Sequence, residues 1–167
     1  MVWESFFDAV IPDVLDFDTR SSTVSLRESS GSSPDAYAEE HFADRLAKID
    51  EALSVCEGML NAITRLEQEV RVLQNLSDGG TRPELDRLAT DLSNLRKDIQ
   101  ATRNSLSFAH QLLSTAEGKT DAGIRTLLLD IQGTLDTAES SLQLADREYD
   151  RLQRTLQRIA GRGSREV

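Results

Sequence analysis

The sequence is poor in the residues that crosslink or interrupt small folds. Its only cysteine is Cys56, so no disulfide can form within the chain, which agrees with a reducing compartment. Three prolines in 167 residues are typical of long uninterrupted helices. Aromatic residues make up 5% of the chain and hydrophobic residues 38%. That is little for the core of an α/β domain but enough for the narrow apolar seam of elongated helices.

Long apolar runs and a surplus of positive charge are also missing. No run of 18 apolar residues is present, so we expect no transmembrane helix. The N-terminus has no basic stretch followed by an apolar one, so we expect no secretory signal and a cytoplasmic or virion-assembly location. The net charge is −10, and residues 1–60 contain 13 acidic against 4 basic side chains. This balance argues against binding to nucleic acid phosphates.

Three segments carry apolar residues at alternating spacings of four and three. The first contains Phe42, Leu46, Ile49, Leu53, Cys56, Leu60 and Ile63. The second contains Leu88, Leu92, Leu95, Ile99, Thr102, Leu106, Ala109, Leu113 and Ala116. The third contains Ile124, Leu128, Ile131, Leu135, Ala138, Leu142, Ala145, Tyr149, Leu152, Leu156 and Ile159. Because this average spacing of 3.5 keeps one stripe facing a partner helix, the pattern predicts helices that wrap around one another.

Turn and capping residues separate the three segments and predict helices at 34–76, 83–117 and 121–160. Pro34 and Pro83 are suited to the first turn of a helix, and Gly161 is expected to end the third helix. Connections of a few residues force consecutive helices to run antiparallel. The predicted fold is therefore all-α, an elongated antiparallel three-helix coiled-coil bundle over 34–160. An open arrangement, in which a helical hairpin pairs with other protomers, fits the same pattern.

The N-terminal residues differ in composition from the bundle. Residues 1–18 are predicted to form a short amphipathic helical arm, and residues 19–33, rich in serine, a flexible linker. The arm's apolar residues are the candidate partner-docking site: Trp3, Phe6, Phe7, Val10, Ile11, Val14 and Phe17. Its acidic side chains oppose binding to anionic lipid, so docking into a protein groove is favoured, with packing on the chain's own bundle as the alternative.

A second candidate site is an arginine stripe on the third helix. Its members, spaced by four, three and four, share one helix face: Arg147, Arg151, Arg154 and Arg158. Such a stripe can contact anions or an acidic protein surface. The alternative is a solvated face with acidic neighbours and favourable cations near a helix C-terminus. Residues 161–167 are predicted to form a basic C-terminal tail.

The residues usually responsible for catalysis or metal binding are few and scattered. His41 and His110 fall on different predicted helices, and Cys56 occupies a seam position, where cysteine acts as a small apolar residue. Zinc sites and activated nucleophiles need several groups that converge. We therefore expect no catalytic, metal or cofactor site and predict that the protein is not an enzyme.

One irregularity interrupts the first helix. Glu67 falls where the seam predicts an apolar residue, and the apolar stripe shifts to Leu66, Val70, Leu73 and Leu76. A weakened seam could accept an additional helix from a regulated partner. The small seam residues of the other helices, including Ala109 and Ala138, are expected to thin the core.

These features favour a non-enzymatic structural or adaptor protein. Its bundle would be a rigid spacer that assembles with itself or with a protein partner, and its arm would be the docking element. The alternative is a helical component of a delivery or secretion machine, such as a virion part or a subunit of conjugative or type IV secretion. A third class is a regulatory domain that sequesters a helical partner at the weakened seam.

Overall fold

The computed structural model describes residues 34–77, 79–116 and 122–163, and side chains at 41–77, 79–116 and 123–162. It contains three long helices, α4 (Pro34–Leu76), α5 (Arg82–Ala116) and α6 (Ala122–Gly163). The described ranges contain no strand. The predicted arm and linker, residues 1–33, lie outside the described residues.

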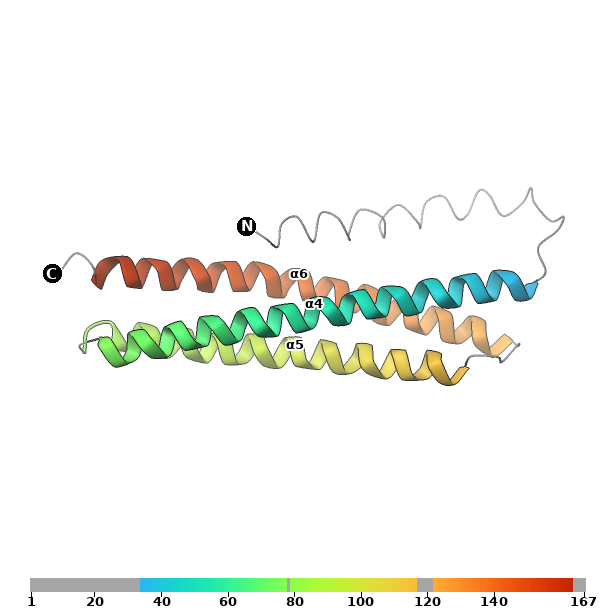
Figure 1. Cartoon of the computed structure of the whole chain (residues 1–167), viewed down its shortest axis with the longest axis horizontal. Helices are drawn as coiled ribbons and strands as arrows, with labels where there is room; N and C mark the ends of the chain where they lie inside the picture. Colours follow the sequence, from blue (N-terminus) through green and yellow to red (C-terminus); the bar gives the residue numbers. More distant parts are fainter. Residues whose placement is uncertain (1–33, 78, 117–121, 164–167) are drawn as a thin grey trace. The chain divides into compact units, whose positions relative to one another are not determined.

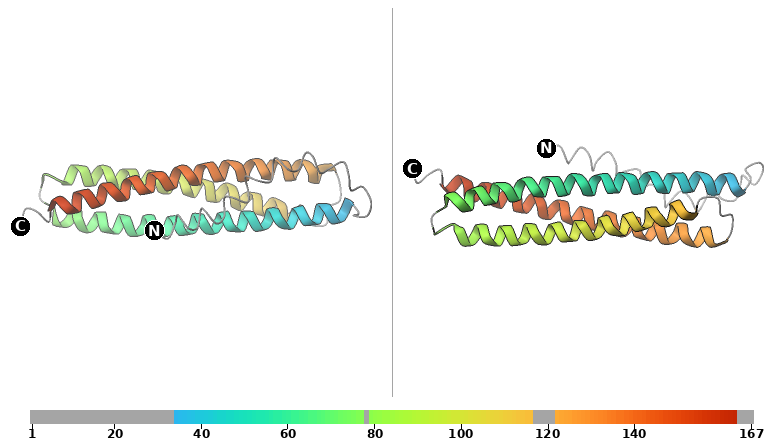
Figure 2. Two further views of the ribbon diagram at one scale, coloured as in Figure 1. Left: turned by 90° about the horizontal axis from the view of Figure 1, so that it is seen from above. Right: turned by 60° about the horizontal axis from the view of Figure 1, so that its bottom comes forward.

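Internal contacts divide the chain into residues 1–39 and residues 40–167. In the first unit the structure describes only the opening turns of α4. In the second unit, α4, α5 and α6 lie side by side and alternate in direction, as the views in Figure 1 and Figure 2 agree. The prediction of an all-α antiparallel three-helix bundle is confirmed.

The core follows the predicted seams. On α5 nearly every seam residue is buried, and so is Leu85, three residues before the first seam residue, Leu88. On α6 the buried residues are Ile131, Ala138, Leu142, Ala145, Leu152, Leu156 and Ile159. No polar or charged residue is buried among the described ones. The bundle is thus held together chiefly by removal of apolar surface from water, as expected for heptad-patterned helices.

The buried residues of α4 form two columns. One column follows the predicted seam at intervals of seven residues, through Ile49, Cys56, Ile63 and Val70. The second column contains Met59 and Leu66, each one residue before the position that the seam predicts, and the predicted Leu60 is only half-buried. The departure that the sequence places at Glu67 is therefore already present one heptad earlier, at Leu60.

The helix ends agree with the predicted ones except at the C-terminus. Helix α4 spans the predicted range, and the ends of α5 and the start of α6 differ from prediction by one residue. The prediction that Gly161 ends the last helix is wrong, because α6 continues to Gly163 and Gly161 has no left-handed backbone. The neighbouring Arg162 lies 3.7 Å from Glu84 of α5, and a cation in a last helical turn is favourable. The segment predicted as a basic tail, 161–167, therefore begins within the last turn of α6, and residues 164–167 lie outside the described residues.

Candidate functional site

Charged residues on one flank of α5 connect it to α4. Arg96, Arg103 and His110 are spaced by seven residues, so they repeat along the same flank of the helix. Arg103 lies 3.3 Å from Glu57, and His110 Nε2 lies 3.4 Å from Asp50. The sequence pattern gives no partner for either histidine. The heptad spacing of these basic residues places them on one flank, and the structure shows that this flank faces α4.

The third pair in this row is the most enclosed. Arg96 donates hydrogen bonds from Nε and Nη2 to the two carboxylate oxygens of Glu67, at 3.2 and 2.8 Å. Arg96 Nη2 also donates to Thr64 Oγ1 at 2.8 Å. The side chains of Arg96 and Glu67 are 30% and 22% exposed, so water screens this pair less than the outer pairs. The acid that interrupts the seam of α4 therefore pairs with α5, and the docking of an additional helix at this point stays a prediction.

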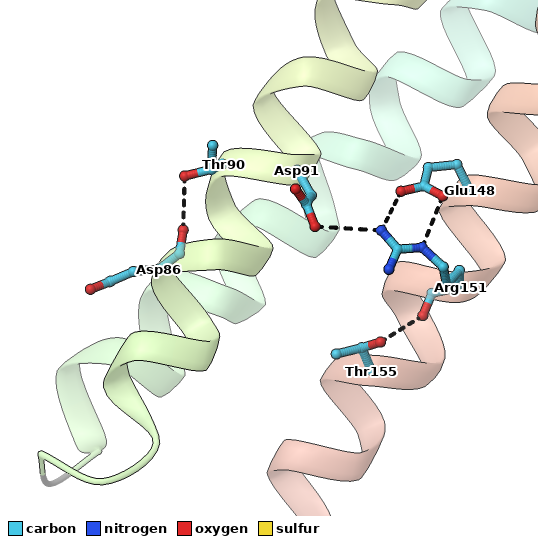
Figure 3. A network of polar contacts seen from close by, with 6 residues as sticks. All are labelled: Asp86, Thr90, Asp91, Glu148, Arg151 and Thr155. Carbon is cyan, nitrogen blue, oxygen red and sulfur yellow. Dashed lines mark hydrogen bonds and ion pairs between the residues drawn. The ribbon is translucent and has the colours of Figure 1, made fainter.

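The opposite flank of α5 faces α6. Glu84 and Asp91, again seven residues apart, lie 3.7 and 3.4 Å from Arg162 and Arg151. Figure 3 shows Arg151 between Asp91 and Glu148. Arg151 donates hydrogen bonds from Nη2 to both carboxylates and a further one from Nε to Glu148 at 2.9 Å. The hydrogen bond and charge of Arg151 lower the pKa of the Glu148 carboxyl.

The arginine stripe of α6 is partly engaged in these contacts. Arg151 pairs with Glu148 and Asp91, and Arg154 lies 3.8 Å from Asp150. Arg147 and Arg158 are exposed and form no ion pair with another described residue. The structure thus places the four arginines on one face, as the spacing predicts. Their role in contacting an anion or an acidic partner stays a prediction.

A groove runs between α5 and α6 on the flank that continues beyond Asp91. Its volume is about 860 Å³. Small residues line most of it, among them Ala101, Thr102, Ser105, Gly133, Thr137 and Ser141. Leu144 also lines it and is 65% exposed. Three acidic residues, Asp98, Asp130 and Glu148, line it as well. A groove with small side chains on the outside of a bundle is a place where another helix can pack, and the sequence pattern does not predict it.

Comparison of the chain with known proteins adds no constraint on this groove. No protein-family model, curated protein or solved structure matches the chain. Among the residues that the structure describes, no helix is long and apolar enough to cross a membrane. The same residues include no group of three or more histidine, cysteine, aspartate or glutamate side chains placed to hold a metal ion. The docking residues predicted in the arm, from Trp3 to Phe17, lie outside the described residues.

Cys56 is a core residue in the structure. Its side chain is fully buried, and burial raises the pKa of the thiol to about 11. The nearby Arg103 lowers it only partly. Since the thiolate is the reactive form, a thiol in this state is a packing residue and not a nucleophile.

We expect the Cys56 thiol of the folded protein to react with an aromatic disulfide reagent at least about 100-fold more slowly than the same thiol in the urea-unfolded chain. The raised pKa alone lowers the thiolate fraction by about this factor at neutral pH, and burial adds to it. Release of the coloured thiol measures the rate, and a Cys56→Ala chain gives the baseline. Equal rates in the folded and unfolded chains would contradict the buried position.

Proposed function

We propose that the protein is a non-enzymatic structural or adaptor protein that works through protein–protein contacts. Its bundle is a rigid spacer, and its N-terminal aromatic arm is a docking element. The observation that carries the proposal is the division of roles in the described bundle. Its interior contains only apolar residues, its charged groups link one helix to the next, and its groove is lined by small side chains.

A spacer must keep its shape under load, and the contacts between helices support this. Three side chains of α5 contact acidic residues of α4: Arg96, Arg103 and His110. Two acidic side chains of α5, Glu84 and Asp91, contact arginines of α6. Exposed pairs add little stability one by one, but their arrangement opposes sliding of one helix along another. Fixed register along the bundle is what a spacer needs.

The arm's role is tested in the full chain. We expect a triple variant, Trp3→Ser, Phe6→Ser and Phe7→Ser, to lose part of the assembly of the native chain because it removes the arm's largest apolar side chains. Sedimentation equilibrium would show a lower average mass, approaching the 18.5 kDa monomer, with helical circular dichroism unchanged.

A matched control replaces three serines of the linker, Ser21, Ser22 and Ser25, by alanine. This control should keep the native mass, because it changes the same number of residues near the arm without removing apolar surface. If the arm variant assembled as the native chain does, the docking role of the arm would have to be given up.

A further inference from the structure

The outer face of α5 and α6 combines a groove with exposed apolar side chains at both of its ends. Leu144 of α6 lies at one end and is 65% exposed. On α5, Phe108 and Leu112 continue the stripe of Ser105 by three and seven residues, and they are 62% and 37% exposed. Together with the groove, these exposed apolar side chains form one face of the bundle that a partner can cover.

The register between the two helices places these side chains relative to one another. The ion pair of Asp91 with Arg151 sets one level on both helices. Seventeen residues further along α5 is Phe108, and seventeen residues back along the antiparallel α6 is Thr134. Phe108 therefore lies near the level of Thr134, about 15 Å from the level of Leu144 at about 1.5 Å per residue. Between the two levels the groove is lined by small residues.

This arrangement is self-complementary about a two-fold axis. A two-fold axis that lies in the interface plane and crosses the groove at right angles, at the level of Ala138 and Glu139, exchanges the level of Phe108 with that of Leu144. Each of these side chains of one copy would then face the opposite end of the other copy's groove. An isologous interface has this property, since the same patch serves both subunits.

The charges of the same face point to the same axis. Asp130 lines the groove at one end, and Arg147, exposed and without an ion pair to another described residue, lies just beyond Leu144 at the other. The midpoint between these two residues along α6 is again the level of Ala138 and Glu139. An antiparallel copy would therefore bring Arg147 of each chain beside Asp130 of the other. The acids at the Leu144 end are Glu148, which is already paired with Arg151, and Asp98, which is exposed at the level of Leu144.

We propose that the α5–α6 face binds a second copy of this chain, with the two copies antiparallel about a two-fold axis at Ala138 and Glu139. This deepens the proposed function by naming the partner of one face, and it rests on that function only for assembly through protein contacts. Apolar side chains from each copy enter the groove of the other, and reciprocal Arg147–Asp130 pairs set the direction.

The test uses full-length chains and sedimentation equilibrium over a range of concentrations. We expect Leu144→Glu and Phe108→Glu each to raise the dissociation constant of self-association by about 30-fold or more, since each replaces an apolar contact of the interface by a charge. Because both side chains are exposed, helicity and thermal midpoint should not change. The matched control is Val72→Glu, a 57% exposed position on α4, which does not line the groove.

Charge reversal tests the two-fold geometry itself. Arg147→Asp and Asp130→Arg should each weaken self-association by about two- to fivefold, and the double variant should restore it, because the reversed pair forms between copies. A chain that is monomeric at about 1 mM would overturn the proposal. So would groove variants that associate as tightly as the Val72→Glu control, or a double reversal that is weaker than both single ones.

Failure here is distinguishable from failure of the proposed function. If the arm variant lowers the mass and the groove variants do not, the two-fold face is wrong and the arm remains the docking element. If the groove variants lower the mass and the arm variant does not, the face stands and the role of the arm is lost. If the groove variants associate normally but no longer retain another protein that the native chain binds, the face belongs to that partner and the proposal of a second copy is wrong.

Discussion

Leu152→Ala is expected to lower the free energy of unfolding by about 2–5 kcal/mol. Leu152 is 1% exposed on α6, and its truncation would leave a cavity in a core in which only apolar side chains are buried. Domains of this size are stable by only about 5–15 kcal/mol, so the loss is a large share of the total.

The control for this prediction is Leu129→Ala on the same helix. Leu129 is 72% exposed, so the same chemical change should alter the free energy of unfolding by no more than about 0.5 kcal/mol. Urea unfolding followed by circular dichroism measures both, at a chain concentration low enough for self-association to be negligible. Equal effects of the two substitutions would mean that α6 does not bury the stripe that contains Leu152.

The sequence alone predicted the helices and the core because both follow from local spacing. The heptad positions of α5 identify Leu92, Ile99 and Leu106 as core residues, and all three are buried. Turn residues such as Gly79 and Gly80 separate the segments, which is why the end of α4 was predicted correctly. The spacing of apolar residues within one helix is sufficient to predict these features, without knowing which helix packs against it.

The groove and the contacts between helices could not be predicted in the same way. Heptads identify the residues that face the axis, but the two flanks of each helix are equivalent until the handedness of the bundle is known. On α5, Arg96 and Asp91 occupy opposite flanks, and only the structure shows that the first faces α4 and the second α6. The prediction that Gly161 ends α6 was wrong for a related reason. The next residue, Arg162, contacts Glu84 on another helix, and the sequence of α6 does not contain that contact.

Removing the Arg96 side chain is expected to lower the free energy of unfolding by about 1–2 kcal/mol. In Arg96→Ala, Glu67 loses both of its hydrogen bonds while it remains only 22% exposed, and Thr64 loses a donor. In a double-mutant cycle with Glu67→Ala, we expect a coupling free energy of about 1 kcal/mol, because the two side chains interact chiefly with each other. Chemical unfolding of the four chains measures it.

The pair of Arg103 with Glu57 is the control within the same row. These side chains are 44% and 63% exposed, so their coupling should be smaller, below about 0.5 kcal/mol, and should fall further at high salt. Replacing Glu67 and Arg96 together by leucine should be neutral or stabilising, because it exchanges a partly buried charged pair between two helices for apolar contact. If that double variant were instead strongly destabilised, the charged pair of Glu67 and Arg96 would be needed for the packing of α4 on α5.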